Sequence, residues 1–309
     1  MKKILIGVIT YNQEDVIRRA LDSVLCQREW GLYRIVVNDD CSKDRTWDIL
    51  QEYKEKYPDI MEIHRNEHNL GIYGNVEKRD EYVKQIDYDL YGALAGDDAY
   101  CGGYFEAVQK LIEKEHIDTN ETVGIYSNWK LSQPNGGEHI FTQEAALSGK
   151  NLWSLYIRGL VSGRSLMITK SVREQYEGLM HGCGLNLTES HYDSQSHLII
   201  QKAYYLPQVT TIYYSGIGVS TKLSTQKSDY ATIQCIEKWE YFLAHYVHNK
   251  RDEYYAKYEI LKAGYLLSPK WSDYFKMMYY YIKGQLPSNA SPAKRTIKNF
   301  LTLATYKRN

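Results

Sequence analysis

The chain has 309 residues, and its 38 lysines and arginines balance 38 aspartates and glutamates. This length allows one large α/β domain with its own core and a smaller appended region, and it excludes a mini-protein scaffold. Because the formal net charge is zero, no overall field attracts nucleic acid, and we expect no nucleic-acid partner. The five cysteines lack the spacing of a zinc site or of a disulfide framework, which favours a cytoplasmic location.

The start of the chain reads as a strand rather than as a targeting segment. Residues 4–9 are apolar, but polar residues follow at once and no cleavage site comes after them. No stretch approaches the roughly 20 apolar residues that a membrane-spanning helix needs. We therefore expect a soluble protein that at most lies on a membrane surface.

Short β-rich runs alternate with helical patterns over the first 130 residues, which predicts an α/β fold with a mostly parallel sheet flanked by helices. We expect Asn12, Glu14 and Asp15 to cap the first helix and to place acidic charge in its first turn. The expected strands are 4–9, 35–38, 60–63, 90–95 and 123–129. The expected helices cover 16–25, run from 44 to 57, follow 68–74 and cover 105–112.

The pattern changes beyond residue 130. Residues 131–222 are less regular, with a turn at 134–137, whereas 223–309 are predicted to form a helical, tyrosine-rich and basic C-terminal extension. In 293–306, the apolar residues fall on one side of a helical pattern, beside basic residues. This arrangement fits peripheral contact with an anionic membrane surface, and equally fits packing on the first domain.

Polar residues follow three of the predicted strands, at the sheet edge where α/β proteins bind ligands. They are Thr10–Asn12, Asp39–Asp40 and Asp97–Asp98. One acidic pair is most often a cap or a solvated turn, but two pairs at matched strand ends favour a ligand site. A carboxylate here can accept the imide N–H of uracil or thymine, while a ring such as Tyr11 stacks on the base. The second pair can offer oxygen ligands to Mg²⁺ or Mn²⁺, which would neutralise charge on a departing diphosphate.

Five segments of the chain match one known family in order and spacing. They are VITYNQEDVIRRALDSVLCQ, VVNDDCSKDRT, HNLGIYGNVEKR, LAGDDAY and YDSQSHLIIQKAYYLPQVTTIYYSGIGVS. Together they resemble the family 2 glycosyltransferases, nucleotide-sugar-dependent enzymes of the GT-A fold. The third and fourth segments are most similar to enzymes of bacterial surface-polysaccharide assembly. The resemblance covers residues 3–221 and is specific as an ensemble.

The resemblance implies a GT-A-type, Rossmann-like catalytic domain over residues 1–222. Residues 1–130 would form its nucleotide-sugar-binding half and residues 131–222 its acceptor-side half. The implied donor-binding residues are Thr10, Tyr11 and Glu14 at the nucleoside, Asp39 at the base, Asn69 and Gly71 bordering the donor pocket, and Arg79 at a phosphate.

The resemblance also implies the residues of the reaction itself. Asp98 would be the main metal ligand, and Asp97 would face the ribose or the donor sugar as a second metal candidate. Asp193 matches the catalytic base by its distance from the strand that follows, with Glu189 as the alternative. An inverting transfer needs one such carboxylate to accept the acceptor's hydroxyl proton.

The sequence also departs from the family's pattern. Ala95 stands where many relatives carry an acid, and Cys41 stands where glycine is common. The closing loop has Tyr213–Ser215 where an arginine often follows the first tyrosine, so a familiar phosphate contact is missing. His181, His191 and His197 lie near the proposed base in sequence, and we expect them to be surface or core residues rather than metal ligands.

These inferences predict an inverting hexosyltransferase. The donor would be a UDP- or dTDP-linked hexose, the cofactor a divalent metal (Mn²⁺ or Mg²⁺), and the acceptor a growing glycan or a lipid-linked oligosaccharide at the inner membrane face. One alternative is a nucleotidyltransferase, but the segment TYNQED after the first strand lacks the expected glycine-rich loop. The other is a non-catalytic carbohydrate- or lipid-binding protein of the same fold, against which Asp98 and Asp193 both argue.

Overall fold

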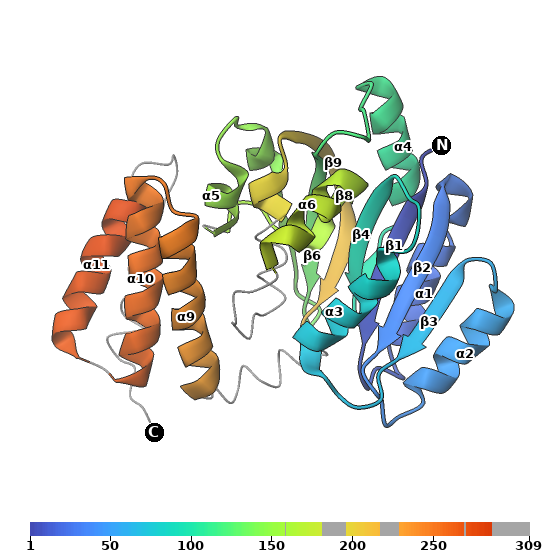
Figure 1. Ribbon diagram of the computed structural model, residues 1–309, viewed down its shortest axis with the longest axis horizontal. Coiled ribbons are helices and arrows are strands. Elements are labelled where there is room, and N and C mark those ends of the chain that lie inside the picture. Colours follow the sequence, from blue (N-terminus) through green and yellow to red (C-terminus); the bar gives the residue numbers. More distant parts are fainter. Residues whose placement is uncertain (158, 181–195, 217–228, 269, 286–309) are drawn as a thin grey trace. The chain divides into compact units, whose positions relative to one another are not determined.

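The computed structural model describes residues 1–157, 159–180, 196–216, 229–268 and 270–285. The chain divides into two compact units, the larger containing most of residues 1–222 and the smaller most of residues 223–309. The larger unit combines strands and helices, and the smaller one is helical (Figure 1). The functional division expected at residue 130 stays a prediction.

The described part of the larger unit contains a nine-stranded sheet in the order β3-β2-β1-β4-β8-β6-β9-β5, with β7 paired to β6. One half is parallel and consists of β1 (Ile4–Thr10), β2 (Leu32–Asp39), β3 (Met61–Arg65) and β4 (Leu90–Ala95). The other half consists of β5 (Ala99–Tyr100), β6 (Val123–Ser132), β7 (Glu138–Phe141), β8 (Leu166–Thr169) and β9 (Lys202–Tyr214). In this second half β6 and β9 are parallel, and the remaining pairs are antiparallel.

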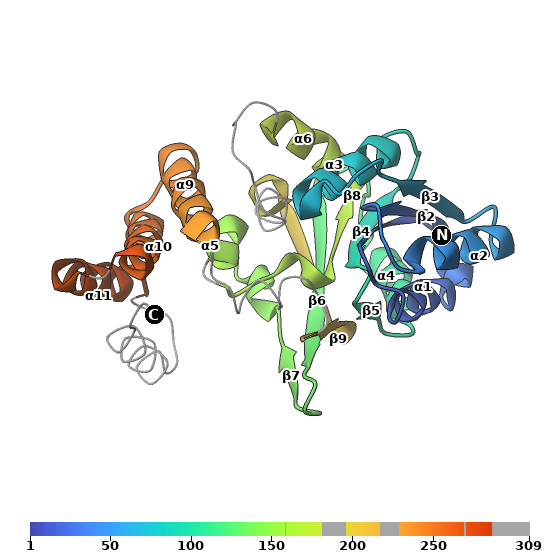
Figure 2. The same cartoon turned by 90° about the horizontal axis from the view of Figure 1, so that it is seen from below.

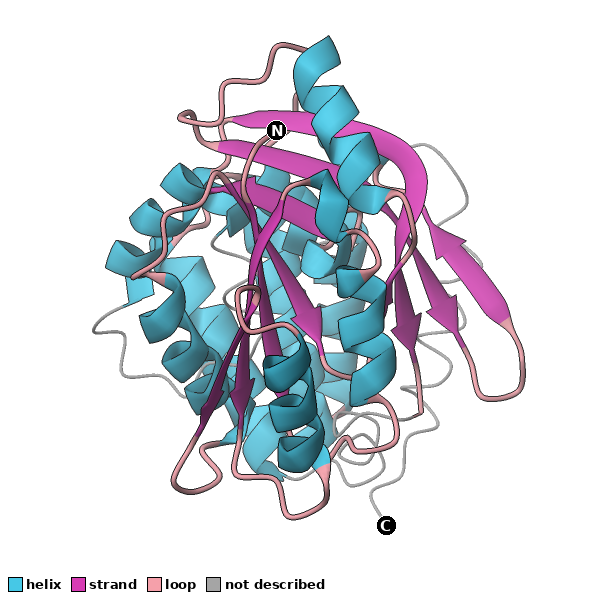
Figure 3. Ribbon diagram, turned by 90° about the vertical axis from the view of Figure 1, so that its right-hand side faces the viewer, coloured by secondary structure: helices cyan, strands magenta, loops and turns pink. Residues whose placement is uncertain are grey.

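Helices cover both faces of this sheet (Figure 3). Successive side chains of a strand point to opposite faces, so Ile4, Ile6 and Val8 of β1 join one buried cluster and Leu5 joins another. The first cluster includes side chains of α1 (Ile17–Leu25), α2 (Thr46–Lys56) and α4 (Tyr104–Lys114). The second includes side chains of α3 (Gly71–Val83), α5 (Leu152–Ile157) and α6 (Lys170–Met180). The predicted α/β fold is confirmed.

The start of α1 differs from the expectation. No side chain caps this helix. Asn12 instead has a left-handed backbone, with φ 50°, and its Oδ1 accepts a hydrogen bond of 2.7 Å from the Lys43 backbone N–H. The Glu14 carboxylate likewise accepts the Arg45 backbone N–H at 2.9 Å. The polar side chains that follow β1 therefore join this loop to the loop after β2, rather than satisfying the first turn of their own helix.

The smaller unit consists, in its described residues, of α9 (Asp229–His245), α10 (Lys250–Leu267) and α11 (Trp271–Gln285). Helix α10 packs against both α9 and α11 (Figure 2). Its start is capped by Asn249, whose side chain accepts the backbone N–H groups of Arg251 and Asp252. Tyrosines fill much of the buried cluster between α10 and α11, which consists of Tyr258, Tyr265, Tyr274, Met277 and Tyr281. The sequence pattern at 293–306 lies outside the described residues.

None of the helices in the described ranges is both long enough and apolar enough to cross a bilayer.

Candidate functional site

The ends of β1 and β2 lie side by side, with Thr10 paired to Asp39 in the parallel register. The buried Thr10 hydroxyl donates to Gln13 Oε1 at 2.7 Å. Tyr11 is half-buried and Glu14 is exposed at the start of the following loop. The sheet therefore brings three of the residues expected at the nucleoside to the edge where Asp39 ends its strand.

Asp39 is completely buried, and its carboxylate is held by polar groups of the loop after β2. Its Oδ2 accepts the Ser42 backbone N–H at 3.0 Å and lies 3.3 Å from Arg65 Nε, while Oδ1 accepts the Ser42 hydroxyl. Burial raises the pKa of the Asp39 carboxyl, and the contacts with Ser42 and Arg65 oppose that rise. Because the side chain has no exposed surface, a nucleobase can reach it only if the Ser42 loop moves.

Asp40, the neighbouring acid, builds the loop that carries Asn69 and Gly71. Its Oδ1 accepts the Leu70 backbone N–H at 2.8 Å, and its Oδ2 accepts the Gly71 backbone N–H at 2.9 Å. Gly71 has φ +75°, a conformation that favours glycine, and Asn69 is exposed. Asp40 thus positions the Asn-Leu-Gly loop beside the second strand end, and both of its carboxylate oxygens accept a backbone N–H of that loop.

Cys41, one of the departures from the family pattern, lies at a turn with an unusual backbone conformation. Its backbone has φ 60°, in the region that glycine adopts most readily, so the glycine that the resemblance leads us to expect here would fit this turn. Its buried Sγ lies 3.3 Å from Lys43 Nζ. The side chain is therefore accommodated at the turn without a role in ligand binding being required.

The Asp97–Asp98 pair follows β4 directly and is buried close to the end of β1. Gly96 N donates to Ile9 O at 3.0 Å, and a Cβ at Gly96 would lie only 2.3 Å from Gln13 Oε1. Burial raises the pKa of the Asp97 carboxyl, although Arg19, Arg164 and Gln13 act in the opposite direction. The missing side chain at residue 96 thus lets the acidic turn lie against the loop that follows β1.

Two arginines flank the acidic pair, and neither was singled out from the sequence. Arg164 Nη1, from the short 3₁₀ helix η3 (Gly163–Ser165), lies 3.9 Å from Asp98 Oδ2, and its guanidinium carbon lies 3.7 Å from the centre of the Tyr213 ring. Arg19 of α1 donates to the backbone oxygen of Asp97 and lies 3.6 Å from the centre of the Tyr214 ring. The two tyrosines that end β9 therefore hold two guanidinium groups at the acidic pair.

These tyrosines are also joined directly to the acidic turn. The Tyr214 backbone N–H donates to Asp98 Oδ1 at 3.1 Å. The closing loop has no arginine after its first tyrosine. In the structure, Arg19 of α1 and Arg164 of η3 bring positive charge to this place instead.

The sequence does not distinguish Arg19 from its neighbour. Arg18 and Arg19 are adjacent in the chain, but Arg18 points to the surface and pairs with Glu52.

Arg79 does not fit the phosphate contact that the resemblance implies. Its guanidinium is buried against the middle of the sheet, with Nη2 2.7 Å from Asp80 Oδ1. Asp80 Oδ2 lies 3.0 Å from Arg173 Nη2, so two arginines share one buried carboxylate beside the Tyr91 ring. Both arginines hold the pKa of Asp80 below its ordinary value despite burial. Arg79 is therefore part of a buried ion-pair cluster, and we correct its assignment.

Asp193 and its alternative Glu189, together with His181 and His191, lie outside the described residues. His197 is described and is buried, with its ring centre 4.5 Å from that of Tyr156 and 5.6 Å from that of Tyr126. Its aromatic surroundings fit the expected core role rather than metal ligation.

A divalent metal at the acidic pair would need ligands beyond the two carboxylates. No group of three His, Cys, Asp or Glu side chains suited to a metal occurs in the part of the chain that the structure describes. The Asp98 carboxylate has a positively charged neighbour in the structure, because Arg164 lies 3.9 Å from it. Asp98 and Asp97 carry carboxylate oxygens of the hard type that Mg²⁺ and Mn²⁺ prefer.

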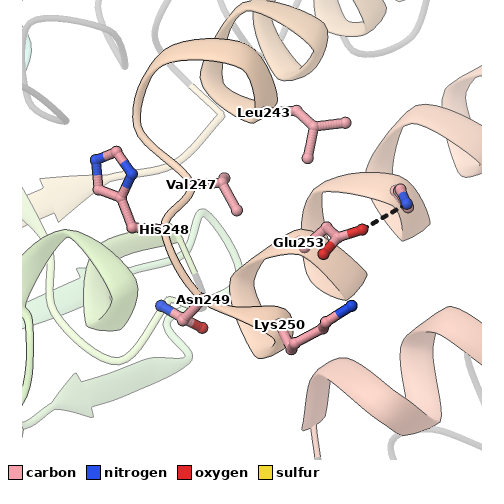
Figure 4. A pocket seen from close by; sticks show the side chains of 7 residues that line it. Leu243, Val247, His248, Asn249, Lys250 and Glu253 are labelled. Atoms are coloured by element: carbon pink, nitrogen blue, oxygen red, sulfur yellow. Dashed lines mark hydrogen bonds and ion pairs between the residues drawn. The ribbon is translucent and has the colours of Figure 1, made fainter.

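The smaller unit contains a pocket of about 380 Å³ between the end of α9 and the start of α10 (Figure 4). Leu243 and Val247 line it from one side, and Lys250 and Glu253 from the other. Glu253 pairs with Lys257 at 2.6 Å, so its charge is already balanced. The pocket is lined by apolar side chains, a paired carboxylate and lysines, without a cluster of carboxylates, and this lining indicates no particular reaction.

The family model named "Glycosyl transferase family 2" matches residues 5–159, which include the first three strand ends and the acidic pair. The chain belongs to glycosyl transferase family 2. This confirms the resemblance that the sequence motifs predict.

Two relatives illustrate the sequence similarity of this family member. A poly(ribitol-phosphate) beta-glucosyltransferase of Bacillus spizizenii is 40% identical over 97 residues, or 29% of this chain and 15% of that protein. An uncharacterised protein of Mycobacterium tuberculosis is 34% identical over 88 residues, or 27% of this chain and 25% of that protein. The chain thus spans no more than a quarter of these relatives' lengths.

Solved glycosyltransferase structures share the fold. S. aureus TarS 1–349 has a TM-score of 0.58 at 16% identity, covering 91% of this chain and 80% of that chain. The mannosyltransferase PcManGT of Pyrobaculum calidifontis, in complex with GDP-Man and Mn²⁺, has a TM-score of 0.53 at 15% identity, covering 99% of this chain and 81% of that chain. At such low identity these likenesses establish the GT-A fold, which confirms the predicted fold class.

Proposed function

We propose that this protein is an inverting glycosyltransferase that moves a hexose from a UDP- or dTDP-linked donor to a hydroxyl of a glycan or of a lipid-linked acceptor. The observation that carries this proposal is the gathering of Asp39, Asp97 and Asp98 at neighbouring strand ends of a family 2 sheet, with two arginines at the second pair. Nucleotide-sugar donors suit such a site, because it combines a buried acceptor for a base with counter-charges for a diphosphate.

The nucleoside would occupy the edge formed by β1 and β2. Asp39 would accept the imide N–H of the base after the Ser42 hydroxyl turns away, and the half-buried Tyr11 ring would stack on it. Thr10 and Glu14 would border the nucleoside through the loop after β1. Asn69 and Gly71, held by Asp40, would border the donor pocket.

The diphosphate would lie at the second acidic pair. Arg19 and Arg164 are already held there by Tyr214 and Tyr213, so they would bind phosphate oxygens with little reorganisation. When bound on Asp98, with Asp97 beside it, a divalent metal would neutralise charge on the leaving diphosphate. The guanidinium groups would add to this neutralisation and compensate for Ala95, where many relatives carry a further acid.

The transfer step itself needs one carboxylate on the acceptor side. As the acceptor oxygen attacks the anomeric carbon, the bond from that carbon to the diphosphate breaks, and the hydroxyl proton passes to the base. We propose Asp193 for this base and Glu189 as the alternative. A single base is enough for inversion, because the acceptor attacks opposite the leaving group.

The proposal is tested with the full chain and a panel of UDP-, dTDP- and GDP-linked hexoses, with Mn²⁺ and without it. We expect release of the nucleoside diphosphate from one UDP- or dTDP-sugar, increased by a hydroxyl-bearing glycan acceptor. Inverted configuration in the product, measured by NMR, supports the single-base step. Tight nucleotide-sugar binding without release in any arm would instead indicate a non-catalytic binding protein of this fold.

A further inference from the structure

Helix α11 carries four large apolar side chains on its solvent-facing side. Trp271 and Phe275 are each 64% exposed, Tyr279 is 51% exposed and Ile282 is 43% exposed. Their spacing of four, four and three residues places them along one side of a helix with 3.6 residues per turn. We call these four residues the α11 stripe.

A different side of α11 already supplies the helix with its core contacts. Tyr274, Met277 and Tyr281 are buried in the cluster shared with α10. The α11 stripe lies outside this cluster and meets it only at its margin, where Trp271 and Phe275 contact the Tyr274 ring. Its apolar surface remains exposed in the structure, although burying it would be favourable.

The clustering of exposed apolar residues on α11 is unusual within this molecule. The other large exposed apolar side chains among the described residues come from separate segments of the larger unit: Met1, Tyr33, Ile72, Ile140, Leu147 and Leu160. Single exposed apolar residues are normal on protein surfaces, whereas a contiguous group marks an interaction site.

The charges around the α11 stripe are predominantly positive. Lys276 and Lys283 are exposed on the same helix, and Lys283 Nζ lies 5.8 Å from the centre of the Tyr279 ring. Lys270 directly precedes the helix and is also exposed. Asp273 is the one acid in residues 270–285, and it lies 4.0 Å from Lys276. The stripe is thus bordered by a net positive charge.

We propose that the α11 stripe binds the surface of an anionic lipid bilayer. Trp and Tyr rings favour the boundary between head groups and acyl chains, where an apolar ring and a polar atom are both accommodated. Lysines beside such rings are attracted to anionic head groups, and their long side chains can extend toward them. The helix would lie in the plane of the interface, with Trp271 and Phe275 inserted.

This proposal is independent of the catalytic one, because it concerns adsorption alone. The test uses the full chain and co-sedimentation with two kinds of vesicle: phosphatidylcholine alone, and phosphatidylcholine mixed with phosphatidylglycerol. We expect binding to the mixed vesicles, weakened by added salt. Replacing both Trp271→Ser and Phe275→Ser should weaken it about tenfold or more, and each of Lys276→Gln and Lys283→Gln should weaken it about fivefold.

The matched control replaces two exposed apolar residues of the larger unit, Ile140→Ser and Leu147→Ser, and should leave vesicle binding unchanged. Absence of wild-type binding to the mixed vesicles would overturn the proposal, as would full binding by the Trp271→Ser, Phe275→Ser variant.

One further outcome assigns the stripe to a different occupant. If that double variant dissociates an oligomer seen by sedimentation equilibrium without lipid, a second copy of the chain covers the stripe. This result overturns the lipid assignment, whereas an unchanged monomeric state with lost vesicle binding supports it.

Discussion

Arg164 lies with its guanidinium carbon 3.7 Å from the centre of the Tyr213 ring, and from this position its Nη1 comes within 3.9 Å of Asp98 Oδ2. The Tyr213 ring holds the cation at the acidic turn, and the Tyr214 ring does the same for Arg19. Groups fixed before a ligand arrives bind charge without the cost of reorganisation. The site therefore has its positive charges in place as part of the fold.

Arg164→Ala should weaken binding of UDP by about tenfold or more, because a charge-assisted hydrogen bond to phosphate is lost. Arg164→Lys should retain part of the affinity, since the charge remains but the planar fork does not. Calorimetric titration of UDP with Mn²⁺ and without it measures both effects. Equal affinity in the wild type and Arg164→Ala would remove this arginine from the diphosphate site.

Arg19→Ala should also weaken UDP binding, and the chain offers a matched control one residue away. Arg18 lies on the same helix, but it is exposed and pairs with Glu52 at the surface. Arg18→Ala should therefore leave UDP affinity unchanged, while Arg19→Ala lowers it several-fold by the same titration. If the two variants behave alike, the effect comes from helix charge in general and not from a phosphate contact.

Asp98→Ala should abolish metal-dependent transfer, because the main oxygen ligand of the proposed metal is removed. Loss of Mn²⁺ binding in the presence of UDP, followed by electron paramagnetic resonance, provides a readout that does not depend on turnover. Asp59→Ala is the control, since Asp59 is exposed in the turn after α2. Full metal-dependent activity in Asp98→Ala would contradict the assignment.

Asp193→Asn should remove transfer but preserve donor binding, because an amide cannot accept the acceptor's proton. Glu189→Gln tests the alternative under the same conditions. Single-turnover assays of product formation, combined with calorimetric titration of the donor, separate chemistry from binding. If Glu189→Gln alone eliminates transfer, the role of base passes to Glu189.

Asp80→Asn should destabilise the fold by about 3 kcal/mol or more, because two buried arginines lose the carboxylate that they share. Urea unfolding measures this difference. The pKa of Asp80 is lower in the folded protein than its ordinary value of 3.8, so its contribution is complete above that value. The stability gap between the wild type and the variant should therefore narrow as the pH falls below about 3.8 toward the folded pKa.

A control for Asp80→Asn is Asp87→Asn, which removes an exposed partner of Lys3 and should leave the urea unfolding midpoint nearly unchanged. A stability gap for Asp80→Asn that stays constant from neutral pH to well below 3.8 would show that the shared carboxylate is not the source of the effect.

The elements of residues 1–130 were largely predictable, because their apolar periodicity is strong, whereas β7, β8, α5 and α6 were not among the expected elements. The run 90–95 forms β4 with the predicted bounds, and the apolar face expected for 16–25 is the buried face of α1. Family membership and the GT-A fold followed from the order of the motifs. The ends of helices were less predictable. Asn12 was expected to cap α1, but its side chain accepts the backbone N–H of Lys43, in a loop that only the folded sheet brings near.

The contributions of individual polar residues were not predictable from the sequence. Asp39 and Asp40 are adjacent acids, and only the return of the 66–71 loop reveals that Asp40 positions backbone N–H groups. Arg79 follows the Asn-Leu-Gly motif closely, but its position on α3 turns it into the core rather than toward the strand ends. Such roles depend on which segments meet in space, and spacing along the chain does not encode them.

The position of β8 in the sheet has a consequence for the order in which the chain assembles. Because β8 lies between β4 and β6, strand β4 has an unpaired edge until residues 166–169 have been synthesised. Arg164 lies two residues before that strand. A nascent or truncated chain ending before this point therefore leaves one edge of β4 open and lacks one of the two counter-ions of the acidic turn.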